Sequence, residues 1–178
     1  MKKKLFVLWG IIVILVTILA LAGCSKNSAG TPGTATPTKT IAGGSYSVKS
    51  IVPTINGDNV SIPSRIVNSN KNVEFNVAFV QGNSSYMAYE YNGTIQVRAS
   101  ICVPCQGRSF TLKGNNLLCN NCGTVFSAQT GIGISGVPAC QNYPKASVPF
   151  TTGADGSLTM TKADLLTAYT NTLTPGLP

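Results

Sequence analysis

The sequence predicts a mainly β fold: a small β-sandwich or hairpin domain with two CxxC knuckles and a short C-terminal helix. Short runs of β-branched and aromatic residues alternate with turns that contain Gly and Asn from residue 46 onward. Two CxxC pairs interrupt this pattern, and one helical pattern follows near the C-terminus. A chain of 178 residues is long enough for one domain with a buried core.

Residues 1–23 are predicted to be a signal peptide. Three lysines at positions 2–4 precede 19 uncharged residues, 5–23. The run ends in L-A-G-C at 21–24, which resembles the bacterial lipobox, whose cysteine is diacylated and becomes the first mature residue. We therefore expect Cys24 to attach to membrane lipid on the extracytoplasmic face. The alternative is an uncleaved anchor helix, since a span needs roughly 20 residues. That alternative places the polar part on the same side.

Residues 24–44 are predicted to form a lipidated, flexible linker, and residues 45–178 the metal-binding β domain. The linker is small, polar and rich in Gly, Pro and Thr. Such a segment buries too little apolar surface to offset the entropy lost on ordering.

Within the domain, each strand is predicted from a short apolar or alternating run bounded by turn residues. The predicted strands are 46–52, 60–63, 73–80, 86–91, 95–101, 148–151 and 158–160. Asn92-Gly93 predicts a hairpin between two of them. The tyrosines at 86, 89 and 91 are expected to form an exposed cross-strand set.

The helix is predicted over residues 161–173. Thr161 and Asp164 have the spacing of a capping box, and Pro175 ends the pattern. Its expected apolar face consists of Leu165, Leu166, Tyr169 and Leu173.

The composition excludes several classes of function. The chain contains no histidine, which removes Ser-His-Asp catalysis, HExxH zinc sites and ordinary Rieske ligation. Its five carboxylates are scattered along the sequence, without a close pair for acid–base work. The 13 Lys and Arg residues are dispersed, without a nucleic-acid-binding motif. We therefore expect neither an enzyme nor a nucleic-acid-binding protein, and any metal must be held mainly by sulfur.

The two CxxC pairs predict a metal site. Cys102 and Cys105 form the first pair, and Cys119 and Cys122 the second. Each CxxC turn allows two thiolates to converge on one ion while backbone N–H groups face the sulfurs, and two such turns complete a tetrahedron. Phe110 and Phe126 each follow a knuckle, in positions to cover the site.

The fifth cysteine of the domain, Cys140, is a candidate additional ligand. Three alternatives remain open for the cysteines. They form disulfides, with Cys140 unpaired, or a structural zinc knuckle, or an iron or iron–sulfur centre. Thioredoxin-like chemistry is not expected, because no helix pattern follows the first CxxC.

The stretch from residue 60 to residue 140 resembles the bacterial family of membrane iron–sulfur-containing, FtrD-like domains. Its matching pieces are V-S-I-P at 60–63, VRASICVPC at 97–105 and CNNCGTVF at 119–126. The last piece, PACQNYP at 138–144, departs from the family's G-G-C-N-P around Cys140. The resemblance implies an extracytoplasmic, membrane-associated iron–sulfur or iron domain, linked in part of the family to ferrous iron uptake with a membrane permease or redox partner.

A second, partial resemblance is to the second half of a Rieske domain, over residues 112–160. The shared elements are the cysteine turn, G-x-x-F, T-G and S-G-x-P-A. Cys105 and Cys122 stand where that family has imidazoles, which implies all-thiolate ligation and a lower potential.

These patterns together predict a lipid-anchored redox or metal-handling accessory. Its iron or iron–sulfur centre is held by Cys102, Cys105, Cys119 and Cys122, with Cys140 as an optional fifth ligand. The alternative is a zinc- or disulfide-stabilised binding module on the cell surface.

Overall fold

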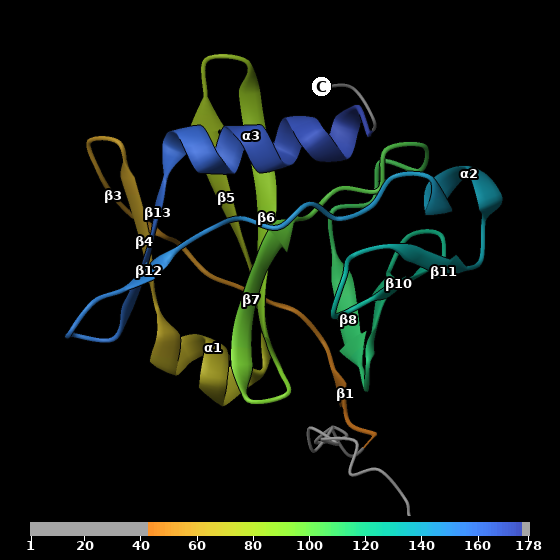
Figure 1. Cartoon of the computed structure of the whole chain (residues 1–178), viewed down its shortest axis with the longest axis horizontal. Coiled ribbons are helices and arrows are strands. Elements are labelled where there is room, and N and C mark those ends of the chain that lie inside the picture. The colour runs from red at the N-terminus through yellow and green to blue at the C-terminus, as the bar shows by residue number, and fades with distance from the viewer. Residues whose placement is uncertain (1–42, 176–178) are drawn as a thin grey trace, which may run out of the picture. The chain divides into compact units, whose positions relative to one another are not determined.

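The computed structural model describes residues 43–175, and this part of the chain is mainly β, as predicted (Figure 1). The predicted signal peptide, the proposed lipid-bearing Cys24 and nearly all of the predicted linker lie outside the described residues. The described strands form three sheets, accompanied by three helices.

The central sheet has the strand order β2-β5-β6-β7. Its strands are β2 (Lys49–Ser50), β5 (Asn72–Phe79), β6 (Gly82–Tyr91) and β7 (Thr94–Ala99). The last three form an antiparallel meander. The predicted hairpin between β6 and β7 is confirmed: Asn92 and Gly93 both have positive φ, at 50° and 78°. Positive φ at both central residues matches the right-handed twist of the two strands.

A second sheet has the order β12-β13-β4-β3, and two helices pack beside the central sheet. Its strands are β3 (Thr54–Asn56), β4 (Asn59–Pro63), β12 (Thr151–Thr152) and β13 (Ser157–Thr161). The helices are α1 (Ser64–Asn70) and α3 (Lys162–Leu173), and α3 crosses over β6 (Figure 1). The predicted cap of α3 is confirmed, because Thr161 Oγ1 accepts a hydrogen bond of 3.0 Å from the Asp164 N–H.

The third sheet carries the cysteines and has the order β1-β8-β9-β10-β11. Its strands are β1 (Ser45–Tyr46), β8 (Phe110–Lys113), β9 (Asn116–Cys119), β10 (Val125–Ser127) and β11 (Gly133–Ser135). The short helix α2 (Pro138–Gln141) follows β11. We call residues 100–144 together with β1 the cysteine lobe, which lies on the right in Figure 1.

Strand β6 lies between two hydrophobic cores. Tyr86 and Ala88 belong to the core that packs against α3, while Met87, Tyr89 and Tyr91 belong to the core that contains the cysteines. Successive side chains of a strand point to opposite faces, so β6 contributes alternately to each core. We call the core beside α3 the aliphatic core, because most of its residues are aliphatic, and the other the cysteine core. The cysteine core comprises Met87, Tyr89, Tyr91, Cys102, Phe110, Leu112, Leu117, Cys119, Phe126, Ala128 and Cys140.

The burial of both faces of β6 corrects one prediction. The prediction that the three tyrosines are exposed is wrong, because Tyr86 and Tyr89 are fully buried and Tyr91 is 8% exposed. A strand that is buried on both faces lacks the alternation of apolar and polar residues that marks a half-exposed strand in a sequence.

Three smaller predictions are also wrong. The predicted strand 46–52 is divided between two sheets, since Tyr46 pairs with Leu112 and Lys49 pairs with Val73. Only Thr151 of the predicted strand 148–151 is in a strand. Leu173 is 37% exposed, because the later turns of α3 bury Ala168 and Thr172 instead. Helix α1 was not predicted.

Candidate metal centre

The first knuckle is a tight turn between β7 and β8. It closes through a 2.7 Å hydrogen bond from the Cys102 N–H to the Gly107 carbonyl. Gln106 has a φ of 59°, and the Gly107 N–H then donates to Cys105 Sγ at 3.4 Å. A Cβ atom on Gly107 would lie 2.8 Å from Cys119 Sγ and 3.2 Å from Cys105 Sγ, so only glycine fits between these two sulfurs.

The second knuckle, between β9 and β10, repeats this backbone turn. The Cys119 N–H donates to the Thr124 carbonyl at 2.9 Å, with the same spacing of five residues. Gly123 has a φ of 70°, at the position equivalent to Gln106. Two similar turns therefore face one another, each presenting two thiols.

The four knuckle thiols converge on one point. Cys102 Sγ lies 3.9 Å from Cys122 Sγ, and Cys105 Sγ lies 3.7 Å from Cys119 Sγ. All four sulfurs lie within 4.8 Å of one another. The structure thus brings together the four ligands predicted from the CxxC spacing.

This geometry fits a tetrahedral thiolate site. Thiolates about 2.3 Å from a tetrahedral ion lie about 3.8 Å from one another, close to both of the sulfur separations above. A disulfide would instead bring two sulfurs to about 2.0 Å, and the described cysteines form none. A four-sulfur donor set suits zinc, a single iron or an iron–sulfur cluster. A cluster with sulfide between two irons needs the two cysteine pairs to lie further apart.

Cys140 lies beside this set, at the edge. It comes from α2, is 1% exposed, and its Sγ lies 3.8 Å from Cys122 Sγ. Its Sγ is not one of the four sulfur atoms that all lie within 4.8 Å of one another. The fifth cysteine is therefore close enough to replace or join a ligand after a small movement, but it is not needed to complete the tetrahedron.

The second knuckle has a feature that the first lacks, the hydroxyl of Thr124. Thr124 is fully buried, and its Oγ1 lies 3.1 Å from Cys122 Sγ. Oγ1 accepts the Val137 N–H at 3.2 Å and the S–H of the Cys122 thiol, and its own proton is available to the sulfur when that thiol is deprotonated. Burial alone would raise the pKa of Cys122, but hydrogen bonds with the hydroxyl and amide of Thr124 and with the thiols of Cys105 and Cys119 together lower that pKa to about 6.

The other buried thiols are shifted in the opposite direction. Burial raises the pKa of Cys102 well above its usual range, and it also raises that of Cys140. Burial raises the pKa of Cys119 to about 11, although the N–H groups of Cys122 and Asn121 oppose the shift. Metal binding must therefore displace protons from these thiols.

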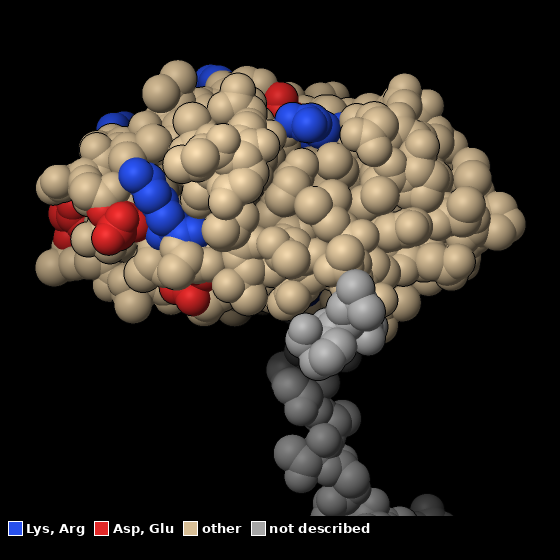
Figure 2. Space-filling model, turned by 90° about the horizontal axis from the view of Figure 1, so that it is seen from above, with Lys and Arg blue, Asp and Glu red and all other residues tan. Residues whose placement is uncertain are grey.

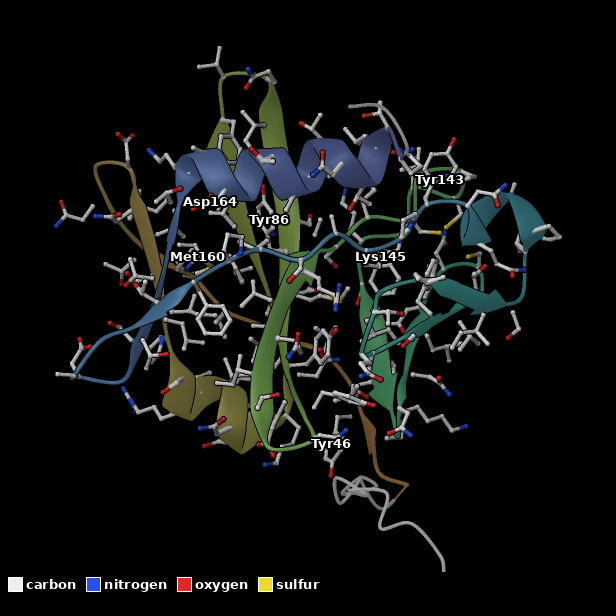
Figure 3. All side chains as sticks on the ribbon, in the orientation of Figure 1. Tyr46, Tyr86, Tyr143, Lys145, Met160 and Asp164 are labelled. Atoms are coloured by element: carbon white, nitrogen blue, oxygen red, sulfur yellow. The ribbon has the colours of Figure 1, made fainter. Side chains whose placement is uncertain are left out.

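Aromatic rings cover the inner side of the site, as expected for Phe110 and Phe126. The two rings meet edge-on, with centroids 5.9 Å apart, and both are at most 1% exposed. Beside them lies Lys145, whose Nζ is 4.2 Å from the centroid of the Phe126 ring (Figure 3). Burial lowers the pKa of Lys145 to about 8, against the attraction of the neighbouring thiolates.

Two buried cations in this region were not predicted from the sequence. Lys145 is fully buried and Arg98 is 5% exposed. Arg98 donates to Tyr89 Oη at 2.8 Å and to the Lys145 carbonyl at 2.8 Å. The sequence does carry a signal for Lys145, since it is the only charged residue between 114 and 154.

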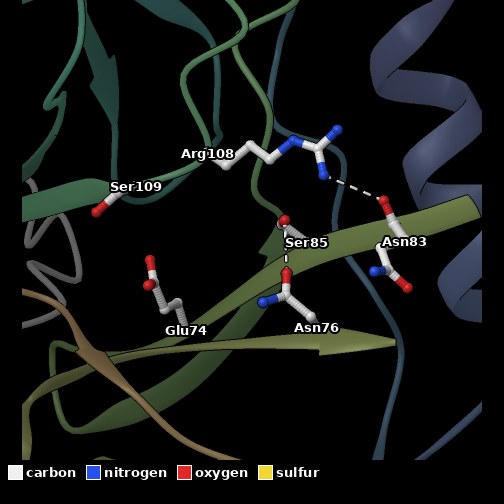
Figure 4. Close-up of a pocket in the computed structure, with 6 residues that line it drawn as sticks. All are labelled: Glu74, Asn76, Asn83, Ser85, Arg108 and Ser109. Carbon is white, nitrogen blue, oxygen red and sulfur yellow. Dashed lines mark hydrogen bonds between the residues drawn. The ribbon is translucent and has the colours of Figure 1, made fainter. Parts of the chain in front are cut away.

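A polar pocket of about 290 Å³ opens near the first knuckle (Figure 4). It is lined by Glu74, Asn76, Asn83, Ser85, Arg108 and Ser109. Arg108 donates to the Asn83 carbonyl, and the Ser85 hydroxyl donates to Asn76 Oδ1. No cysteine lines this pocket, so the thiol cluster remains the candidate site.

Comparison with known proteins gave a family match that covers the cysteines. A family model described as membrane iron–sulfur-containing protein, FtrD-like, matches residues 67–171, which is more than half of the chain and includes Cys102 to Cys140. Comparison with curated proteins and with solved structures gave no significant match. Within residues 43–175, no helix has both the length and the apolar character needed to cross a bilayer. The chain belongs to the FtrD-like family of membrane iron–sulfur-containing proteins.

Proposed function

We propose that the chain holds an iron-based centre, a single iron or an iron–sulfur cluster, through Cys102, Cys105, Cys119 and Cys122. The observation that carries this proposal is the convergence of four thiols within 4.8 Å of one another, which fits a single ion as it stands, whereas a cluster requires the two cysteine pairs to move apart. Membership of a family described as iron–sulfur-containing favours iron over other ions that bind thiolates. When bound, the centre supplies one-electron chemistry, while the knuckles fix its ligands and the aromatic rings exclude water.

The proposed role is that of a redox or metal-handling accessory, without catalytic turnover of its own, in a membrane system such as ferrous iron uptake. The chain has no histidine, and none of its five carboxylates belongs to the group of converging thiols. The site therefore lacks the imidazole and carboxylate groups that most often serve general acid–base catalysis. A membrane permease or a redox protein is the proposed partner.

The anchor of this accessory is proposed to be lipid on Cys24, which holds the domain on the extracytoplasmic face. The L-A-G-C sequence at 21–24 supports this assignment. Mass spectrometry of the N-terminal peptide from a bacterial membrane fraction should show a diacylglyceryl group on Cys24. Replacing Cys24 with Ser should release the mature domain or leave its precursor unprocessed; an unmodified Cys24 in a full-length chain would contradict the assignment.

The metal content of the full chain, purified anaerobically in detergent, tests the iron centre. Iron with broad visible absorbance supports the proposal. Acid-labile sulfide in proportion to the iron identifies a cluster, and iron without sulfide identifies a single ion. Disulfides without metal, found by mass spectrometry, would contradict it.

A structural zinc site is the second candidate, favoured by the sulfur separations of 3.7 and 3.9 Å. These distances match one tetrahedral ion, the geometry that zinc adopts in structural sites. In that case the lobe is a zinc-stabilised binding module. One zinc per chain without colour in the same preparation would establish it.

A further inference from the structure

Lys145 is a charged residue in an otherwise uncharged region. Figure 2 shows Lys, Arg, Asp and Glu side chains from the left to the middle of the visible face, and none at its right-hand end. No charged residue other than Lys145 occurs between positions 114 and 154. Its side chain is nevertheless 0% exposed.

The ammonium group of Lys145 is held at the inner wall of the cysteine core. Its Nζ donates to the Ile101 carbonyl at 2.7 Å and to the Tyr143 carbonyl at 2.5 Å. Ile101 directly precedes Cys102. The main chain of Lys145 is fixed in turn, because its carbonyl accepts from Arg98 and its N–H donates to the Gly131 carbonyl at 2.8 Å.

Within residues 43–175, Lys145 has no carboxylate partner, since the ion pairs of this part consist of Lys71–Glu90. The five acidic residues of the chain are Asp58, Glu74, Glu90, Asp155 and Asp164, and none belongs to the group of converging thiols. A buried charge is unfavourable unless an opposite charge compensates it. The nearby groups that can become anionic are the thiols, beginning with Cys102.

A metal–thiolate centre would provide that opposite charge. Four thiolates around one divalent ion leave an excess of negative charge, and each electron added to an iron centre increases it. A fixed cation beside the site stabilises the more negative state.

We propose that Lys145 is a positioning residue that supplies the counter-charge of the cysteine centre, strengthening metal binding and raising the reduction potential of bound iron. This inference rests on the proposed function of the four cysteines as metal ligands.

The test compares the full chain with two variants that remove the charge in different ways. Lys145→Met keeps most of the length of the side chain, and Lys145→Gln keeps a donor for the two carbonyls. Lys113→Met is the matched control, because Lys113 is an exposed lysine of the cysteine lobe. The readouts are the midpoint potential of bound iron and the Zn²⁺ affinity measured by chelator competition.

We expect both Lys145 variants to have a lower midpoint potential and a Zn²⁺ affinity weaker by about tenfold or more. The Lys113→Met control should match the wild type, because water screens an exposed charge. The metal-free Lys145→Met protein should unfold at a temperature no lower than the metal-free wild type. The substitution removes a buried charge that has no counter-charge when the metal is absent.

Three results would overturn the proposal: unchanged potential and affinity in both variants, full rescue of both by Lys145→Gln, or a metal-free Lys145→Met protein that does not fold. The last would make Lys145 a purely structural residue. If the wild type binds zinc and no iron, the proposed iron function fails, and the Zn²⁺ affinities alone then decide the role of Lys145.

Discussion

The two faces of β6 bury different chemistry. On one face, Tyr86 and Ala88 join an aliphatic core in which Phe75 stacks on Tyr86 with ring centroids 5.6 Å apart. On the other face, Met87 and Tyr89 join a core that contains three buried cysteines and adjoins the buried ammonium of Lys145. Burial of apolar surface is enough to stabilise the first core. The second contains groups that are favourably buried when a metal is bound, so we expect the two cores to respond differently to the same kinds of change.

The largest expected effect comes from replacing Cys119 with Ser, which removes one of four thiols within 4.8 Å of one another. We expect metal affinity to fall more than about a hundredfold, beyond the range seen when residues around a ligand are changed. Hydrogen-exchange mass spectrometry should then show faster exchange across residues 102–141 and little change in β5.

The matched control for that variant is Cys140→Ser, which removes a buried thiol outside the four-sulfur set. We expect this variant to retain metal and its spectrum. Loss of the metal in Cys140→Ser would make Cys140 a required ligand and would contradict the four-ligand account.

The reverse experiment weakens the aliphatic core and leaves the ligands in place. Replacing Phe75, which is 1% exposed, with Ala should lower the free energy of unfolding by about 3–5 kcal/mol, because it leaves a cavity. Chemical denaturation measures this loss. Metal affinity of the folded variant should equal that of the wild type, and a parallel loss of affinity would mean that the two cores are not separable.

A single methyl group at Gly107 should weaken metal binding by roughly tenfold, within the range for changes close to ligands. Its Cβ would lie 2.8 Å from Cys119 Sγ and 3.2 Å from Cys105 Sγ. Gly57→Ala is the control, since the turn between β3 and β4 has open space for a Cβ and only the positive φ of 58° is strained. Chelator competition should separate the two variants; equal affinities would show that the knuckles tolerate displacement.

The smallest effect is expected from Thr124→Val, which removes the hydroxyl beside Cys122. In the wild type that thiol has a pKa lowered to about 6, so the metal-free protein should react with iodoacetamide as pH rises through that value. Loss of the hydrogen bond removes a stabiliser of the thiolate, so the midpoint of the pH–rate profile should move to higher pH. An unchanged midpoint would assign the shift to the backbone amide of Thr124 and the neighbouring thiols of Cys105 and Cys119.

The convergence of the four knuckle thiols was predictable from the sequence because its information is local. Each CxxC pair lies within one turn, and Gly123 marks the positive φ that the second turn needs. The residues that surround the ligands were not predictable in this way. Lys145 reaches the Ile101 carbonyl from 44 residues away, so its role depends on tertiary contacts. The hydroxyl of Thr124 had a weak signal, two residues after Cys122.

The predictions of the fold also differ according to whether they depend on neighbouring or on distant residues. The β6–β7 hairpin and the cap of α3 follow from neighbouring residues, and both predictions are confirmed. The failed strand 46–52 depends on distant partners, since β1 pairs with β8 and β2 pairs with β5. Similarly, burial on both faces of β6 arises only when a second core packs against the central sheet.

X-ray absorption at the iron edge of the anaerobically purified full chain tests the central claim most directly. The account predicts iron whose nearest shell consists only of sulfur, because the chain has no histidine and the four converging side chains are thiols. An additional iron neighbour would identify a cluster, and its absence a single ion. A nearest shell of nitrogen or oxygen, or a preparation that contains no iron, would contradict the account.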